Sequence, residues 1–177
     1  MNKYFFTLVI LVVSLSFTAC SDDDKNEDKV IPTSEFVLGS PYRWDLPNKN
    51  EDVFLIVNSE SEMYRYIESE NETKIAANTP DFGKYTLLVR NVRTTRGISG
   101  IKKELIRHSE VDHTFIICAF TNETTVAENR VVAVTVPKLA TNVQIGQIIM
   151  IKPSGNDFTL ISCNKVGSDF KSHPTQL

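Results

Sequence analysis

Residue types that mark special classes of protein are scarce in this chain. Its 177 residues hold only three Cys, one Trp, seven Gly and seven Pro. So few Gly and Pro exclude a collagen-like or low-complexity chain, and a hydrophobic content of 41% excludes a wholly disordered one. A domain of about 140 residues buries roughly two-thirds of its unfolded surface, so its core needs no metal or disulfide to hold it together.

The motifs of the common enzyme classes are missing as well. The sequence contains no GxSxG, P-loop, GxGxxG or HExxH pattern, no paired cysteines at zinc-site spacing and no Ca²⁺ loop. One group of metal-ligand residue types occurs close together, and its spacing favours a solvated turn: His108, Glu110, Asp112 and His113. We therefore predict a protein that is not an enzyme, with no catalytic residues, no metal site and no cofactor.

The charge is small but unevenly distributed. A formal net charge of −3 gives no reason to expect nucleic acid as a partner. Residues 21–81 carry 15 acidic and 6 basic side chains, whereas residues 82–177 carry 7 acidic and 12 basic ones. The basic residues are densest between Arg90 and Arg107. This favours either a surface for an acidic partner or two oppositely charged halves that neutralise each other within one fold.

Within that basic segment, the turn that contains Arg93, Arg96 and Gly97 is the predicted partner-binding surface. The two arginines lie close together in the sequence, and the glycine has no Cβ atom, so it would let a ligand approach the backbone. The prediction concerns binding and attaches no chemistry to these residues.

The first 19 residues have the three parts of a secretory signal. Lys3 provides a short positive start, residues 4–17 form an apolar run, and two small residues, Thr18 and Ala19, stand directly before Cys20. The apolar run is too short for a comfortable transmembrane helix, which needs about 20 residues. The sequence therefore predicts export, either by an ordinary secretory signal with an incidental cysteine or by a lipoprotein signal.

The cleavage region resembles the lipobox of bacterial lipoproteins, although Phe17 departs from the aliphatic residue usual at its position. In that family the cysteine thiol is diacylated, the signal is cut before the cysteine, and the new amino group is acylated. The resemblance implies that Cys20 carries palmitate-type acyl chains that anchor the mature protein in the outer membrane. Two or three such chains hold a protein firmly, at about 0.8 kcal/mol per buried CH₂.

An acidic segment follows the cysteine. Residues 21–29 carry five acidic and two basic side chains and none that is apolar, so we expect them to stay flexible. With residues 30–35 they would form a tether of about 15 residues with a reach on the order of 20 Å. Cys20 followed by Ser-Asp-Asp-Asp also resembles the export signal of Bacteroidota surface lipoproteins, which implies the outer face of the outer membrane. The alternative is a plain spacer on a lipoprotein of the periplasmic face.

The rest of the chain alternates β-rich runs with short polar links. Residues 53–57 predict a strand buried on both faces, and the capping-box spacing of residues 59–62 predicts a short helix after it. Residues 101–108 are ambiguous between helix and strand. Further strands are predicted at residues 85–92, 114–120, 130–136, 143–151 and 158–163. The pattern predicts an α+β domain with a mostly antiparallel β-sheet of about six to seven strands and one or two short helices.

Several stretches resemble a protease-complex-subunit-B C-terminal-like domain, as found in small Bacteroidota lipoproteins. The matching residues are NSESE at 58–62, DFGKYTLL at 81–88, TRGI at 95–98 and the later run at 121–139. The resemblance covers roughly residues 53–151. It implies this fold and a suggested role in binding or regulating a partner protein, and it brings no catalytic residues with it.

Two further features leave alternatives open. Cys118 and Cys163 lie in predicted strands of an exported chain, so they form either a disulfide or two buried free thiols. The disulfide would close a loop of about 45 residues, worth roughly 4 kcal/mol in the chain-entropy model. Trp44, with Tyr42 and Arg43 beside it, would stack on a sugar if exposed or close one end of the sheet if buried.

Together these features predict a lipid-anchored, non-enzymatic outer-membrane lipoprotein that presents a binding domain to a protein or glycan partner. The alternatives are a regulator or accessory subunit of an envelope protease or polysaccharide-acting enzyme, and a purely structural envelope component. The predicted organisation is a signal peptide at 1–19, the lipidated Cys20 with an acidic tether at 20–35, a single α+β domain at 36–166 and a loose tail at 167–177.

Overall fold

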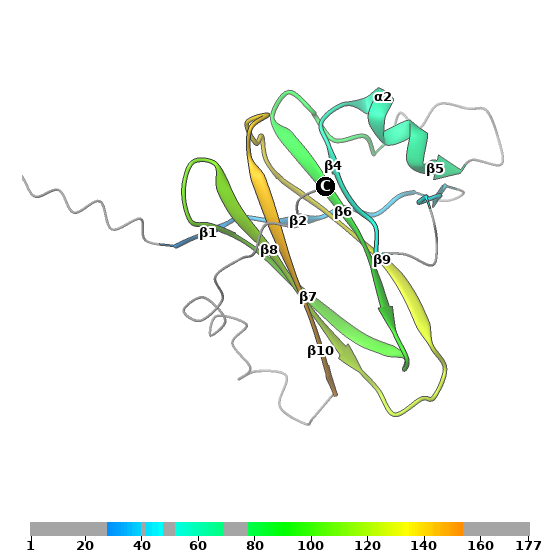
Figure 1. Ribbon diagram of the computed structural model, residues 1–177. Coiled ribbons are helices and arrows are strands. Elements are labelled where there is room, and N and C mark those ends of the chain that lie inside the picture. The colour runs from blue at the N-terminus through cyan, green and yellow to red at the C-terminus, as the bar shows by residue number, and fades with distance from the viewer. Residues whose placement is uncertain (1–27, 40–41, 48–51, 69–77, 154–177) are drawn as a thin grey trace, which may run out of the picture.

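The computed structural model describes residues 28–39, 42–47, 52–68 and 78–153. Within these ranges the chain forms ten strands, one α-helix and one 3₁₀ helix (Figure 1). The short elements are β1 (Lys29–Ile31), β2 (Ser34–Glu35), β3 (Arg43–Trp44), β4 (Phe54–Val57), α2 (Glu60–Met63), η1 (Tyr64–Tyr66) and β5 (Ile67–Glu68). The long strands are β6 (Tyr85–Thr94), β7 (Ile98–Arg107), β8 (Asp112–Thr121), β9 (Glu128–Pro137) and β10 (Gln144–Pro153).

Most strands belong to two four-stranded sheets. The first sheet has the order β1-β7-β8-β10 and the second the order β2-β9-β6-β4, while β3 and β5 form a separate ribbon. β10 runs parallel to β8, and the other pairs are antiparallel. The parallel pair arises because the chain leaves the first sheet after β8, forms β9 in the second sheet, and then returns. This arrangement confirms the predicted α+β class, with mostly antiparallel pairing and few helices.

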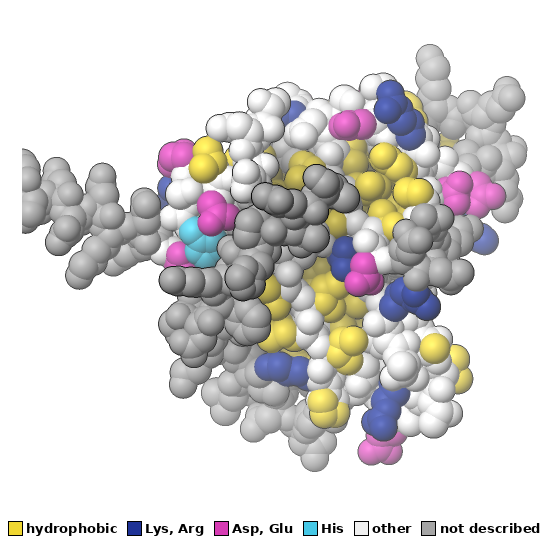
Figure 2. Space-filling view, viewed as in Figure 1, with side chains coloured by type: hydrophobic (Ala, Val, Ile, Leu, Met, Phe, Trp, Pro, Cys, Tyr) yellow, Lys and Arg dark blue, Asp and Glu magenta, His cyan; other side chains and the backbone are white. Residues whose placement is uncertain are grey.

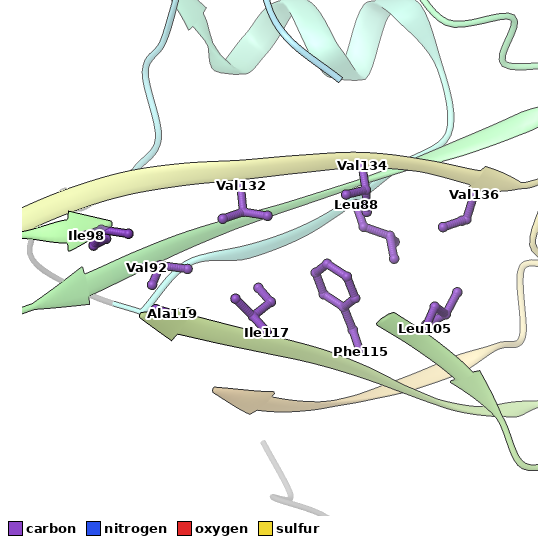
Figure 3. Packing of buried hydrophobic residues seen from close by; sticks show 10 residues of the cluster. All are labelled: Leu88, Val92, Ile98, Leu105, Phe115, Ile117, Ala119, Val132, Val134 and Val136. Carbon is purple, nitrogen blue, oxygen red and sulfur yellow. The ribbon is translucent and has the colours of Figure 1, made fainter. Parts of the chain in front are cut away.

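The two sheets pack face to face around the main core. Successive residues of a strand face opposite sides, so every second side chain of β6, β8 and β9 points between the sheets. Figure 3 shows these side chains pointing toward one another from both sheets. The rings of Phe115 and Phe54 stack there with centroids 6.0 Å apart. The buried members of this core are Leu88, Val92, Ile98, Leu105, Phe115, Ile117, Ala119, Val132, Val134 and Val136.

The second sheet is covered on its other face too. Leu87 and Val89 of β6 point away from the main core and pack in a second cluster with the fully buried Met63 of α2. Trp44 packs against the same cluster, and its ring meets the ring of Phe36 edge to face at 6.2 Å between centroids. Since Trp44 is half-buried in this packing, the structure favours its core role over a sugar platform.

The predicted cap forms at the start of α2, although Glu62 bonds the residue before the N-cap and not the N-cap Ser59 itself. The Ser59 hydroxyl accepts a hydrogen bond from the backbone N–H of Glu62 at 3.2 Å. The Glu62 carboxylate in turn accepts one from the backbone N–H of Asn58 at 2.8 Å. The α-helix lasts a single turn, after which the chain tightens into η1 and then extends into β5.

The predicted burial of residues 53–57 on both faces is wrong. The strand β4 forms, but it lies at the edge of the second sheet, and Ile56 is 36% exposed. A run of β-branched residues specifies an extended chain, but it does not specify how many strands lie beside it. The ambiguous residues 101–108 are resolved as strand, since β7 runs through Arg107.

The ordered fold begins earlier than the predicted boundary at residue 36. Lys29–Ile31 pair with β7 and Ser34–Glu35 pair with β9, so these residues are strands of the two sheets and not part of a flexible tether. Val30 and Ile31 supply the β-branched side chains that make this pairing favourable. The predicted strand at 158–163 and the tail at 167–177 lie outside the described residues.

Candidate binding surface at the basic turn

The three residues predicted to bind a partner lie together in the structure. Arg93 is near the end of β6, and Arg96 and Gly97 are in the turn that leads into β7. Both arginine side chains are exposed, whereas Gly97 is buried. We call residues 93–97 the basic turn.

A second loop supports the basic turn from one side. The backbone N–H of Gly97 donates to the Thr124 hydroxyl at 3.2 Å, and its carbonyl accepts from the backbone N–H of Asn122 at 2.9 Å. Asn122 and Thr124 are also joined by hydrogen bonds between themselves. Thr94 adds a hydrogen bond from its hydroxyl to the carbonyl of Arg96. The turn is therefore held in one conformation before any partner arrives.

Glu128 and Arg130 fix the other side of the turn. The Glu128 carboxylate accepts a hydrogen bond from the backbone N–H of Ile98 at 2.6 Å, and Arg130 donates to the carbonyl of Ile98 at 3.1 Å. The hydrogen bond from Ile98, followed by the one from Arg130, lowers the pKa of Glu128. The charge of Glu128 is thus directed at the start of β7 and at Arg130.

The structure changes the role expected for Gly97. A Cβ atom built at this position would lie 2.4 Å from the Thr124 hydroxyl and 2.7 Å from the Asn122 side-chain oxygen. Glycine is therefore required because another part of this chain approaches the backbone, not because a ligand does. The sequence pattern at residues 122–124 gave no sign of this, since Asn and Thr are common in any polar loop.

Replacing Gly97 with alanine should destabilise the fold by about 1–3 kcal/mol, because the added methyl group overlaps Thr124 and Asn122. The measurement is the free energy of unfolding by urea denaturation. Gly146→Ala is the matched control, since its Cβ would meet the nearest atom at an ordinary 3.7 Å. An equal free energy of unfolding for the two variants would show that the second loop moves aside without destabilising the fold.

Basic side chains elsewhere in the segment 90–107 are already engaged. Ion pairs join Arg90 to Asp52 at 3.3 Å, Lys103 to Glu35 at 3.2 Å and Arg107 to Glu110 at 3.4 Å. Two of these join the acidic half of the chain to the basic half, which supports the interpretation that the halves neutralise each other. On the face seen in Figure 2, the Lys and Arg side chains are accordingly scattered among acidic and apolar ones.

Arg96 differs from these residues. Within the part of the chain that the structure describes, it forms no ion pair, and its side chain is exposed. The candidate surface is thus narrower than the charge density of the sequence suggested, and it is confined to the basic turn.

The N-terminal entry point is Lys29, where the chain enters the first sheet through β1. The basic turn lies at the opposite end of this sheet. β7 begins at Ile98, beside the turn, and ends at Arg107, which pairs with Lys29 of β1. The ten residues of β7 span about 30 Å at roughly 3.3 Å per residue. Figure 1 shows β1 and the β7–β8 turn at one end of the molecule and the β6–β7 turn at the other.

The group of metal-ligand residue types lies near the N-terminal entry point. No cluster of three or more His, Cys, Asp or Glu suited to a metal ion occurs in the described ranges. His108 contacts Asp28 at 2.6 Å and the Thr114 hydroxyl at 2.8 Å. His113 is 3% exposed, so the solvated turn predicted for this segment ends before it.

Burial of His113 gives the fold a defined pH dependence. Burial, helped by the charge of Arg107, lowers the pKa of the His113 imidazole in the folded protein. Below the ordinary pKa of about 6.5 the unfolded chain takes up a proton that the folded chain does not, so stability falls as the pH decreases from 7. We expect His113→Gln to reduce this slope between pH 7 and 5, measured by urea denaturation at each pH. Val111→Ala should keep the slope, and an unchanged slope in the His113 variant would contradict the assignment.

The remaining predicted site residues are the cysteines. Cys118 is 1% exposed and is disulfide-bonded. Cys20 and Cys163, the other two cysteines of the chain, lie outside the described residues.

Comparison with known proteins gives no further assignment. No protein-family model matches the chain, and neither a curated protein nor a solved structure does. The resemblance to the protease-complex-subunit-B C-terminal-like domain therefore stays a prediction. No helix in the described parts of the chain is long and apolar enough to cross a membrane.

Proposed function

We propose that this protein is a non-enzymatic lipoprotein held at the outer membrane by acyl chains on Cys20. Its β-sandwich presents the basic turn to an acidic segment of a protein or to an acidic glycan. Carboxylates of either partner would be recognised in the same way, by charge-assisted hydrogen bonds from Arg93 and Arg96.

The position of the basic turn carries this proposal. An anchor at Cys20 would enter the fold at Lys29, about 30 Å along the sheet from the turn. Residues 20–28 would then form a tether of nine residues, with a root-mean-square reach of roughly 15–18 Å. An anchored domain would thus be free to orient its far end, with Arg93 and Arg96, away from the bilayer.

The supported turn is suited to recognition. Its backbone is held by Asn122, Thr124 and Glu128, so binding would not require the loop to be ordered first. Preorganisation of this kind strengthens binding by lowering its entropic cost. A single pair of arginines fits a small acidic epitope. The described surface does not form a continuous basic patch that would suit a polyanion.

The test compares the wild type with the double variant Arg93→Ala/Arg96→Ala in the full-length protein purified from membranes. The probes are a short peptide with two glutamate residues and digalacturonic acid, and proteins captured from the native envelope are identified in parallel. We expect binding of one probe to weaken about 30-fold, as for a hot spot worth about 2 kcal/mol. The probe that responds distinguishes a protein partner from a glycan partner.

A charge-matched control separates the turn from a general loss of positive charge. Lys84→Ala/Arg65→Ala removes the same two charges from exposed positions, and Lys84 directly precedes β6, the strand that runs into the basic turn. This control should bind as the wild type does. If the two double variants bind equally well, or if neither probe nor any envelope protein depends on Arg93 and Arg96, the proposed binding surface is wrong.

A further inference from the structure

The side of the first sheet that faces away from the main core carries an apolar strip beside Lys102 and Glu104, and we call this strip the outer face. It is formed by Ile106, Ile116, Cys118, Phe120, Ile148 and Met150. Ile116, Cys118 and Phe120 are only 3%, 1% and 4% exposed. A sheet face open to water would leave such side chains partly accessible, so another part of the chain covers them.

The described residues do not account for this cover. The apolar side chains that pack against the three buried ones belong to β7 and β10 of the same sheet. Among the described residues, the Lys102 ammonium also lies on this side of the sheet, 5.9 Å from the centroid of the Phe120 ring. Lys102 is also a residue of this sheet, so the covering segment lies outside the described residues.

The disulfide of Cys118 identifies two candidates for that segment. Its side chain points to the outer face, so its partner cysteine approaches from that side. The partner is Cys20 or Cys163, since the chain has three cysteines. Residues 21–28 contain no apolar side chain and would make a poor cover, whereas residues 154–177 contain Phe158, Leu160, Ile161, Val166 and Phe170.

We infer that residues 154–177 cover the outer face and that Cys163 is bonded to Cys118. The choice of Cys163 also rests in part on the proposed function, because an acylated Cys20 holds its sulfur in a thioether. Forming the bond removes one hydrogen atom from each thiol. The two electrons and two protons pass to a protein disulfide oxidase, whose own disulfide becomes two thiols.

The strand register decides how the segment must run. Pro153 pairs with Thr121 and Met150 with Cys118, so ten extended residues, which reach about 33 Å, easily return from Pro153 to Cys118. A tight hairpin at residues 153–156 would instead pair Cys163 with Gly146, which lies opposite Thr114.

In that hairpin Cys163 and Cys118 would be separated by two strand spacings across the sheet and by four residues along it. This separation is about 16 Å, whereas a disulfide requires Cα atoms within about 7 Å. A tight hairpin that pairs the strand predicted at residues 158–163 with β10 and the Cys118–Cys163 bond therefore exclude each other. With the bond in place, the chain crosses the outer face and does not extend the sheet beyond β10.

The first test maps the cysteines of the full-length protein, purified from membranes without reductant. Free thiols are blocked with iodoacetamide, and the unreduced digest is analysed by mass spectrometry. We expect one linked pair of peptides that contains Cys118 and Cys163. A link between Cys118 and Cys20, or alkylation of both Cys118 and Cys163, would overturn the inference.

The same digest reports on Cys20 separately. An unmodified Cys20 with an intact Cys118–Cys163 link would refute the proposed anchor and leave the covering segment in place. An acylated Cys20 together with alkylated Cys118 and Cys163 would support the proposed anchor and refute the Cys118–Cys163 bond.

The second test locates the cover directly. The photoreactive residue p-benzoylphenylalanine replaces Ile148 in the full chain, and crosslinked peptides are identified after illumination. We expect crosslinks to residues 154–177. Replacement of Val126, which is 71% exposed in the second loop, is the control and should not produce them. Crosslinks to its neighbours in β8 and β10 are expected in either case. The absence of crosslinks to residues 154–177, or crosslinks to a segment outside the first sheet other than these residues, would contradict the inference.

Discussion

Replacing Cys20 with serine is expected to remove nearly all of the protein from the outer-membrane fraction. Serine offers no thiol for acylation, so the variant would lose every acyl chain at once. Each buried CH₂ contributes about 0.8 kcal/mol, so the loss of two or three chains should lower membrane partition by about a thousand-fold or more. The measurement is density-gradient separation of inner and outer membranes after a high-salt wash, followed by immunoblotting.

A variant at the next position controls for changes in export. Ser21→Ala leaves the thiol in place and should remain in the outer-membrane fraction. A Cys20→Ser protein that still co-sediments with outer membranes would show that something other than acyl chains holds it there.

Replacing Phe115 with alanine is expected to cost about 3–5 kcal/mol of unfolding free energy. Phe115 is 1% exposed and lies between the two sheets, where its ring stacks on Phe54. Removing it leaves a cavity in the main core between the two sheets, which the strands cannot close without losing their pairing. Urea denaturation measures the change, and the domain should unfold in one cooperative step.

A surface variant sets the scale for that loss. Val126→Ala removes an apolar side chain that is 71% exposed, and its effect should stay within about 0.5 kcal/mol. A cost below 1 kcal/mol for Phe115→Ala would mean that the face-to-face packing of the sheets does not stabilise the fold as described.

The sequence was most informative where structure depends on near neighbours. The Ser59–Glu62 spacing predicted the helix start because a capping box is formed by residues three apart. The β-rich run at residues 85–92 predicted a strand, and β6 forms there from Tyr85 to Thr94.

Features that depend on distant residues were not predictable in this way. The burial of His113, the ion pair of Arg90 with Asp52 and the contact of Gly97 with Thr124 arise from strand pairing, and no local pattern specifies which strands pair. The early start of the fold at Lys29 has the same origin, since β1 is ordered by pairing with β7. Sequence therefore located the basic turn but not the loop that supports it.

The anchor is the claim on which the orientation of the basic turn depends, and the mass of the N-terminal peptide tests it most directly. The protein is extracted from membranes with detergent and digested, and the first peptide is analysed by mass spectrometry. We predict a peptide that begins at Cys20 and carries a diacylglyceryl group on sulfur and a fatty acyl group on nitrogen. A peptide that begins elsewhere, or an unmodified Cys20, would contradict the account.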